Sequence, residues 1–347
     1  MNYLCSLLML LWLNTPVPLE NGHVIGIGIH PAVGTDPAGG VHVVFGRGQT
    51  ILYAMSADGN VFTKPVPIDS LPGLHLGASR GPQIAATRRS VVITAIDKAG
   101  NVWSYTLDRS TGRWQKPVAV TDVPDVAKEG FVALTAGTND SYNAVWLDLR
   151  GNRRNKIVGA RSMDGGRTWS ANRVLYESPD GTVCECCQPS MVSRNGAVAI
   201  MFRNFLNGSR DMYVLRSADD GRSFDKAEKM GEGTWKLNAC PMDGGGLFMA
   251  GDGTVSTVWR RADKLFTARP KQPETELASG KNAKIVTTGK GDYVVFQRDG
   301  RVWAIRPGQA QPVEVGEGAY PKLTLLPNDR VLCLWEQTGS VRADFIK

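Results

Sequence analysis

Two short stretches of this chain have nearly the same sequence. Residues 162–169 read SMDGGRTW and residues 217–224 read SADDGRSF, so both follow the pattern S-x-D-x-G-x-[ST]-[WF]. Each comes directly after an alternating apolar run, which is typical of a β-strand. In a tight hairpin turn, an Asp accepts backbone N–H groups, a Gly adopts a positive φ and a closing aromatic packs beneath the turn. Two copies 55 residues apart indicate a repeating structural unit.

Weaker copies extend the repeat towards the N-terminus. Residues 56–62 contain the same turn one residue short, and residues 108–114 keep Asp, Gly and Trp in the same order. We call the four segments the Asp turns. Their predicted structural residues are Asp58, Asp164, Asp219, Trp169 and Phe224.

Each clear Asp turn lies within a unit of four short strands. One unit has strands at 131–136, 143–147, 157–161 and 170–176, and the next has strands at 189–194, 197–203, 212–216 and 225–230. The units begin at His30-Pro31, Gly81-Pro82, Phe131, Gln188-Pro189, Cys240-Pro241, Asn282 and Tyr320-Pro321. Short, regularly spaced strands without a long helical pattern predict an all-β fold. Internal repetition favours a β-propeller of four-stranded blades over a β-sandwich.

Seven unit starts predict seven blades, and merging the weaker fifth to seventh units would give six. The last unit has room for only three strands, at 321–326, 331–335 and 341–346. The run 23–29 precedes the first inner strand and is free to supply the fourth. We therefore expect both termini to share one blade, which removes an exposed sheet edge.

A length of 347 residues would allow two domains, but the repeat favours a single propeller domain over residues 23–347. Residues 4–13 are apolar and are followed by two prolines, which suits a secretory leader and is too short to span a bilayer. We therefore predict a signal peptide in residues 1–22, a secreted or periplasmic location, no stable membrane insertion and a monomer. Cys5 lies too early for a lipoprotein anchor.

Strand direction assigns the loops of a propeller to its two faces. The turns between the second and third strands share one face with the connections between blades, and the Asp turns lie on the other. Arginines, acids and thiols converge on the face opposite the Asp turns. Arg203, Arg210 and Arg260, together with Arg80, are the candidates for an axial anion site, because a guanidinium matches the oxygens of a carboxylate. Their expected polar partners are Glu185, Asp211, Asp243, Glu317 and Tyr320.

The net charge of +7 fits an acidic ligand. Basic and aromatic residues do not interleave as they do in single-strand nucleic-acid sites, so we expect no nucleic-acid binding. The predicted partner is an acidic glycan or a small anionic ligand.

The Asp turns and the strand order resemble the Asp-box, or BNR, repeats of the sialidase superfamily. That resemblance implies three arginines that bind a sugar carboxylate, a Tyr nucleophile assisted by Glu, and an Asp acid. Here those catalytic roles would fall on Tyr320 with Glu317, and on Asp211 or Asp243. The family's N-terminal Phe/Tyr-Arg-Ile-Pro motif is absent, since residues 29–31 read Ile-His-Pro, and the nearest Arg-x-Pro begins at Arg80.

Residues 184–190 (CECCQPS) and 240–245 (CPMDGG) are similar to segments of a group of bacterial exported sialidase-like proteins. Cys184, Cys186, Cys187 and Cys240 would cluster where two adjacent blades begin. Clustered thiols in an exported protein are usually disulfides, such as Cys187 to Cys240. A metal site is the alternative, with Cu(I) favoured over Zn by the soft thiolates and by the lack of a C-x2-C spacing. No other cofactor is expected, and Cys333 should be buried elsewhere.

Three functions stay open, because one propeller fold supports many activities. They are a sialidase-like glycoside hydrolase, a non-catalytic propeller that binds a glycan or a protein, and a thiol-dependent metal or redox protein. We favour an axial, arginine-rich site for an acidic sugar, with or without catalysis.

Overall fold

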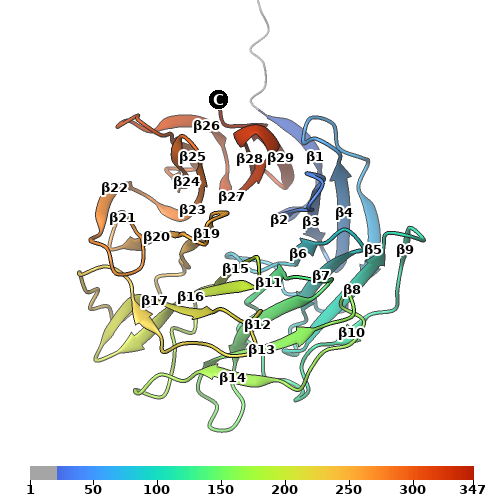
Figure 1. Ribbon diagram of the computed structural model, residues 1–347, viewed down its shortest axis with the longest axis horizontal. Coiled ribbons are helices and arrows are strands. Elements are labelled where there is room, and N and C mark those ends of the chain that lie inside the picture. Colours follow the sequence, from blue (N-terminus) through green and yellow to red (C-terminus); the bar gives the residue numbers. More distant parts are fainter. Residues whose placement is uncertain (1–21) are drawn as a thin grey trace, which may run out of the picture.

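The computed structural model describes residues 22–347, which form seven antiparallel sheets around a central axis (Figure 1). The chain is therefore a seven-bladed β-propeller, as predicted, and the six-bladed alternative is wrong. Within this range, the only helical segment is the single turn Pro327–Asp329, and no helix is long and apolar enough to cross a membrane. The predicted leader falls almost entirely outside the described residues.

The first four blades follow the chain order. The first has β2 (Ile29–Thr35), β3 (Val41–Arg47), β4 (Thr50–Ser56) and β5 (Val66–Ser70). The second has β6 (Gln83–Ala86), β7 (Ser90–Ile96), β8 (Val102–Asp108) and β10 (Val118–Ala119), with β9 (Arg113–Trp114) also paired to β8. The third has β11 (Val132–Ala136), β12 (Tyr142–Asp148), β13 (Lys156–Ser162) and β14 (Arg173–Tyr176). The fourth has β15 (Ser190–Arg194), β16 (Ala197–Leu206), β17 (Ser209–Ser217) and β18 (Glu228–Lys229).

The last three blades complete the ring. The fifth has β19 (Gly246–Met249), β20 (Val255–Arg261), β21 (Lys264–Ala268) and β22 (Thr275–Ser279). The sixth has β23 (Lys281–Thr288), β24 (Gly291–Arg298), β25 (Arg301–Ile305) and β26 (Val313–Glu317). The seventh has β27 (Ala319–Leu326), β28 (Arg330–Gln337), β29 (Ser340–Phe345) and, outermost, β1 (His23–Ile27).

The ring is closed by strands from both ends of the described chain. β1 pairs antiparallel with β29, from His23 opposite Ala343 to Ile27 opposite Ser340. This pairing confirms the expectation that residues near the N-terminus supply the fourth strand of the last blade. Without it, β29 would expose an unpaired edge to solvent.

One predicted strand start is wrong. The inner strand of the fifth blade begins at Gly246, not at the Cys240-Pro241 step. Pro241 has no N–H to donate to a ladder, and the carbonyl of Asp243 accepts hydrogen bonds from a guanidinium instead. Residues 240–245 therefore belong to the connection between blades.

The apolar core lies between neighbouring blades. One cluster joins Val92 of the second blade to Trp146 and Val158 of the third, all fully buried, and Trp169 of an Asp turn packs against it. Phe224 packs in the same way between the third and fourth blades. The closing aromatics of the two clear Asp turns thus fill gaps between blades.

The Asp turns are held by the hydrogen bonds that their residue types predict. The Oδ1 atom of Asp164 accepts the N–H groups of Arg167 and Thr168 at 3.1 and 3.0 Å. This turn also reaches the turn between β11 and β12, because the N–H of Gly165 donates to the carbonyl of Asp140 at 3.0 Å. The Asp turns therefore share one face, the Asp-turn face, with the turns that join first and second strands.

Candidate functional site

A cavity of about 840 Å³ lies on the propeller axis. Each blade lines it with an apolar side chain of its first strand: Val33, Ile84, Leu134, Met191, Leu247, Ile285 and Leu323. Its rim consists of turns between first and second strands, such as Asp36–Gly39 and Thr87–Arg89. The cavity therefore belongs to the Asp-turn face, whereas the sequence prediction placed the axial pocket on the opposite face.

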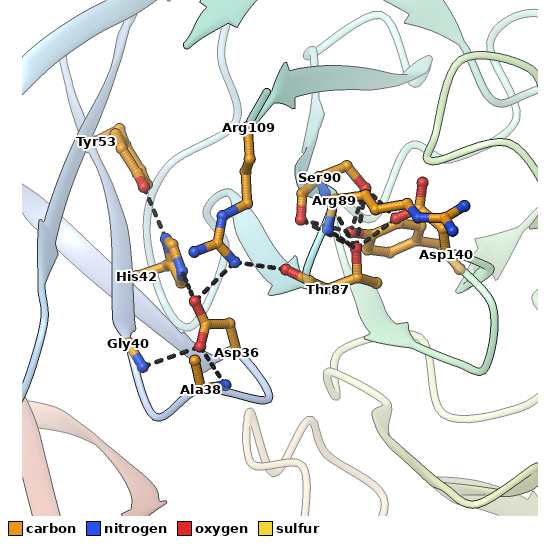
Figure 2. A network of polar contacts seen from close by, with 11 residues as sticks. Asp36, Ala38, Gly40, His42, Tyr53, Thr87, Arg89, Ser90, Arg109 and Asp140 are labelled. Carbon is orange, nitrogen blue, oxygen red and sulfur yellow. Dashed lines mark hydrogen bonds and ion pairs between the residues drawn. The ribbon is translucent and has the colours of Figure 1, made fainter. Parts of the chain in front are cut away.

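Asp36 at the rim is fully engaged by its neighbours. Its carboxylate accepts the N–H groups of Ala38 and Gly40 and forms an ion pair with Arg109 at 2.7 Å (Figure 2). His42 contacts the same carboxylate through Nε2 at 3.2 Å. Burial alone would raise the pKa of Asp36, but the hydrogen bonds from His42 and the backbone, with Arg109, lower it overall. This carboxylate stays ionised and fixes the turn.

Asp140 is the second acid at the rim. Its Oδ1 atom accepts hydrogen bonds from the hydroxyls of Thr87 and Ser90, which links the second and third blades (Figure 2). The hydroxyl of Tyr142 also contacts the Ser90 hydroxyl, at 2.9 Å. Both rim acids therefore serve as structural acceptors.

Three arginines at the rim are different. Arg88 and Arg89 come from the turn between β6 and β7, and Arg194 comes from the end of β15. All three are exposed, and none of their guanidinium groups has a hydrogen bond or ion pair to residues 22–347. The rim therefore presents positive charge and unused donors to solvent.

The axis is nearly filled at the opposite face. The remaining void there is only about 10 Å³, which is room for about one water molecule. Lys284, Lys322 and Tyr320 lie around it. The ammonium of Lys284 donates to the carbonyl of Gly245 at 3.1 Å. Burial and the neighbouring Lys284 lower the pKa of Lys322 to about 7.

The structure brings Arg203, Arg210 and Arg260 together, but their guanidiniums are engaged by protein groups. The Arg203 side chain is 2% exposed and donates to the carbonyls of Asp243, Arg210 and Arg260 at 2.7–3.2 Å. Arg210 donates to the Leu237 carbonyl at 3.2 Å and forms an ion pair with Glu185 at 3.3 Å. These arginines hold the connections between blades in place.

Arg260 and Arg80 are also occupied. Arg260 donates to the carbonyl of Ala262 and lies 3.9 Å from the Asp243 carboxylate. Arg80 donates to the carbonyl of Glu129 at 2.6 Å and stacks on the Phe131 ring. Arg80 thus shares none of these contact residues with the other three arginines.

The predicted acids have separate partners as well. Asp211 accepts the N–H of Trp235 at 2.7 Å, and Asp243 accepts that of Asn282 at 3.1 Å. Burial raises the pKa of Asp243.

The expected nucleophile pair is not formed. The Glu317 carboxylate is 65% exposed and pairs with Arg301 at 3.6 Å, whereas the Tyr320 ring packs on His30 with centroids 4.8 Å apart. Within residues 22–347, no hydrogen bond joins Tyr320 to Glu317. The structure therefore does not assemble the catalytic pair that the sialidase resemblance implies.

Three of the predicted thiols meet in one buried cluster. The sulfur of Cys184 lies 3.6 Å from that of Cys186 and 3.5 Å from that of Cys187, and the latter two are 4.0 Å apart. The Arg210 guanidinium lies 3.1 Å from the Cys184 sulfur. Contacts with the other two thiols, and the charge of Arg210, lower the pKa of Cys184.

The other two described cysteines lie apart. Cys240 is exposed and is not part of the cluster, and Cys333 is fully buried between the sixth and seventh blades. All five cysteines within residues 22–347 are free thiols in this structure, so the expected bridge between Cys187 and Cys240 is not formed.

No family model matches the chain, and no curated protein matches it in sequence. Solved structures do share its architecture. A virginiamycin B lyase from Staphylococcus aureus aligns with a TM-score of 0.56 at 16% identity, over 95% of this chain and 98% of its own. An α-L-arabinanase from Penicillium chrysogenum aligns with a TM-score of 0.55 at 15% identity, over 95% and 99%. The NanB sialidase from Streptococcus pneumoniae aligns at 13% identity with a TM-score of 0.47, over 95% and 70%. At such identities, the first two similarities show a shared propeller fold and nothing finer.

The rim arginines were not predicted from the sequence. The predicted site lies on the face opposite the Asp turns, which leaves out the turns between first and second strands. A signal was present at residues 87–90, where two adjacent arginines occupy a short turn between apolar strands.

Proposed function

We propose that the axial cavity binds an anionic carbohydrate, such as a sugar that carries a carboxylate. The observation that carries this proposal is the contrast at the rim between free and engaged charges. Arg88, Arg89 and Arg194 have no partner within residues 22–347, whereas Asp36 and Asp140 accept several hydrogen bonds each. A guanidinium forms two parallel hydrogen bonds with a carboxylate, so these arginines suit an anionic group.

The shape of the cavity supports the same ligand class. Its volume of about 840 Å³ lies within the usual range for small-molecule sites, about 300–1,000 Å³. Apolar side chains line the walls and polar groups gather at the rim, so an apolar face of a sugar ring has a surface to pack on. Lys284 and Lys322 lie at the far end of the axis, where burial lowers the pKa of both ammonium groups, so the positive charge available to an anion is that of the rim arginines.

The proposed activity is binding without hydrolysis. Most glycoside hydrolases need a protonated carboxylic acid beside the scissile bond, and the acid's pKa is raised for that task. The pKa of Asp36 is lowered instead, and Asp140 is held by two hydroxyls. At the other end of the axis, the void beside Tyr320 is too small for a sugar. A non-catalytic site therefore fits the contacts better than a sialidase site.

The test is calorimetry with N-acetylneuraminate, glucuronate and glucose. We expect the two acidic sugars to bind and glucose to bind at least about tenfold more weakly, because only the acids use charge-assisted hydrogen bonds. Arg89→Ala should weaken binding of the acids by about tenfold or more. Arg47→Ala is the matched control, since Arg47 is an exposed arginine at the end of β3 on the opposite face.

The proposal fails if glucose binds as tightly as glucuronate, or if no sugar in the panel binds. It also fails if Arg89→Ala and Arg47→Ala change the affinity equally. Thermal unfolding of each variant separates a lost contact from a lost fold.

A further inference from the structure

A second site lies in the connection between β14 and β15, away from the axial cavity. Cys184, Cys186 and Cys187 are 0%, 5% and 2% exposed, and their three sulfur atoms form a compact triangle with sides of 3.5–4.0 Å. Nothing in the carbohydrate proposal uses these thiols. The two inferences therefore stand or fall separately.

The spacing of the sulfurs matches a shared ion better than a disulfide. Sulfur atoms in a disulfide are about 2.05 Å apart. An ion with metal–sulfur bonds of about 2.3 Å, placed among three thiolates, separates the sulfurs by about 3.8–4.0 Å. The observed triangle is close to that size before any metal is added.

The loop that carries the thiols is held by its own contacts. The N–H of Val183 donates to the carbonyl of Asn155 at 2.9 Å, and the N–H of Cys184 donates to that of Arg203 at 3.0 Å. At the other end of the loop, the Gln188 side chain donates to the carbonyl of Val132 at 3.2 Å. The sulfurs are thus positioned by the third and fourth blades, which lowers the cost of ordering them around an ion.

Nearby arginines offset the charge of a thiolate site. The Arg210 guanidinium lies 3.1 Å from the Cys184 sulfur, and the positive charge of Arg203 acts on Cys187. Three thiolates with a monovalent ion carry a net charge of −2, which the two guanidiniums offset in part, because Arg210 also pairs with Glu185. Glu185, between the ligands in sequence, turns outward to pair with Arg210 and leaves the triangle all sulfur.

The ligand set selects the class of metal. Among residues 22–347, no His, Asp or Glu adds a ligand atom within 4.8 Å of all three sulfurs. Structural zinc takes four ligands in a tetrahedron, whereas soft thiolates suit Cu(I). We propose that Cys184, Cys186 and Cys187 form a three-thiolate binding site for a soft monovalent metal ion of the Cu(I) type. Binding displaces the thiol protons to solvent, and neither the sulfurs nor the ion changes oxidation state.

The experiment is anaerobic titration of the full chain with Cu(I) against a chromophoric Cu(I) chelator, with Zn(II) titrated in parallel. We expect one Cu(I) per chain and weaker binding of Zn(II). X-ray absorption of the loaded wild type should show about three sulfur neighbours at 2.2–2.3 Å and no nitrogen or oxygen, which tests the site without any substitution.

Substitutions then assign the ligands. Cys186→Ser should weaken Cu(I) binding by more than about 100-fold. This exceeds the loss of about 10–100-fold that is typical when a residue that only hydrogen-bonds to a metal ligand is replaced. Cys240→Ser and Cys333→Ser are the matched controls, one exposed and one buried outside the cluster, and both should bind as the wild type does. Cu(I) should also raise the midpoint of thermal unfolding of the wild type but not of Cys186→Ser.

Three results would overturn the site. One is equal affinity of Cys186→Ser and the wild type for Cu(I), and another is Zn(II) binding tighter than Cu(I). The third is a wild type that binds no Cu(I) after purification without oxidants. In that case, fewer than five titratable thiols among Cys184, Cys186, Cys187, Cys240 and Cys333 would indicate a disulfide in the cluster. None of these outcomes bears on binding of acidic sugars.

Discussion

The two ends of the propeller axis use arginine in opposite ways. At the Asp-turn face, Arg88, Arg89 and Arg194 surround an open cavity and their guanidiniums have no partner within residues 22–347. At the opposite face, guanidiniums such as that of Arg203 donate to backbone carbonyls, and the void on the axis has a volume of only about 10 Å³. Arg88, Arg89 and Arg194 are thus free donors beside the open cavity, whereas Arg203 is a buried structural donor at the closed end. Arg109 is an engaged arginine of the open rim, because it pairs with Asp36.

The difference follows from the length of the neighbouring loops. In the short turn at Thr87, the N–H of Thr87 donates to the carbonyl of Ser90 and the carbonyl of Thr87 accepts from Arg109, so few acceptors remain for Arg88 and Arg89. The long connection 230–245 has carbonyls outside any ladder, and buried carbonyls require a donor. Arg203 and Arg210 supply those donors. Loop length therefore decides whether an arginine is available to a ligand.

The largest effect on stability should come from removing the buried Arg203 guanidinium. Arg203→Ala deletes a guanidinium that donates to three carbonyls and is 2% exposed. Hydrogen bonds to charged groups contribute about 1.5–3 kcal/mol each, so we expect the free energy of unfolding to fall by at least about 3 kcal/mol. Urea denaturation measures this loss, and Arg47→Ala should stay within about 0.5 kcal/mol of wild type. If the two variants had the same free energy of unfolding, the structural role of Arg203 would be contradicted.

The free arginines should show the reverse behaviour. Replacing both Arg88 and Arg89 by Ala should lower glucuronate affinity by about 100-fold or more, since two charge-assisted contacts are lost. The free energy of unfolding should change by less than about 0.5 kcal/mol, because neither guanidinium has a hydrogen bond or ion pair within residues 22–347. Calorimetry at two salt concentrations gives a further check, since the wild type should lose more affinity with salt than the double variant. A large loss of stability would show that these arginines are structural too.

The sequence predicted the architecture because the relevant signals are local. The Asp turns need particular residues at fixed spacing, and the apolar strands alternate around them. Blade number and ring closure followed from counting these units, and β1 indeed pairs with β29. The error at the fifth blade has a cause that is partly non-local, because the carbonyl of Asp243 accepts a hydrogen bond from Arg203, which belongs to β16.

The candidate site was harder to predict, because it depends on which arginines already have hydrogen-bond partners within the protein. Strand order placed Arg203, Arg210 and Arg260 on one face correctly, but no sequence pattern shows that backbone carbonyls will occupy them. The thiol cluster was predictable in part, since three of its four expected members share one short loop. Cys240 lies on a separate connection, and its place depends on how that loop packs.

The pH dependence of stability tests the closed end of the axis. Burial and Lys284 lower the pKa of Lys322 from 10.5 to about 7 in the folded protein. The unfolded chain therefore binds this proton more tightly, so stability is lost as pH falls from about 10 towards 7. Lys322→Met removes that loss and should be more stable than wild type by about 1–2 kcal/mol at pH 7, allowing for partial solvent screening. The gain should vanish near pH 10, and a gain independent of pH would contradict it.

The smallest effect concerns the support that an Asp turn gives to the open rim. Asp164 accepts two backbone N–H groups and the Thr168 hydroxyl, and the next residue, Gly165, donates to the carbonyl of Asp140 at the rim. Asp164→Ala should therefore lower the free energy of unfolding by about 1 kcal/mol, as loss of a capping side chain usually does. Asp164→Asn keeps an acceptor and should lose less than half as much. Because the rim is held only indirectly, glucuronate affinity should fall less than about threefold in either variant. A tenfold loss of affinity with little change in unfolding would mean that the Asp turn contributes to the binding site itself.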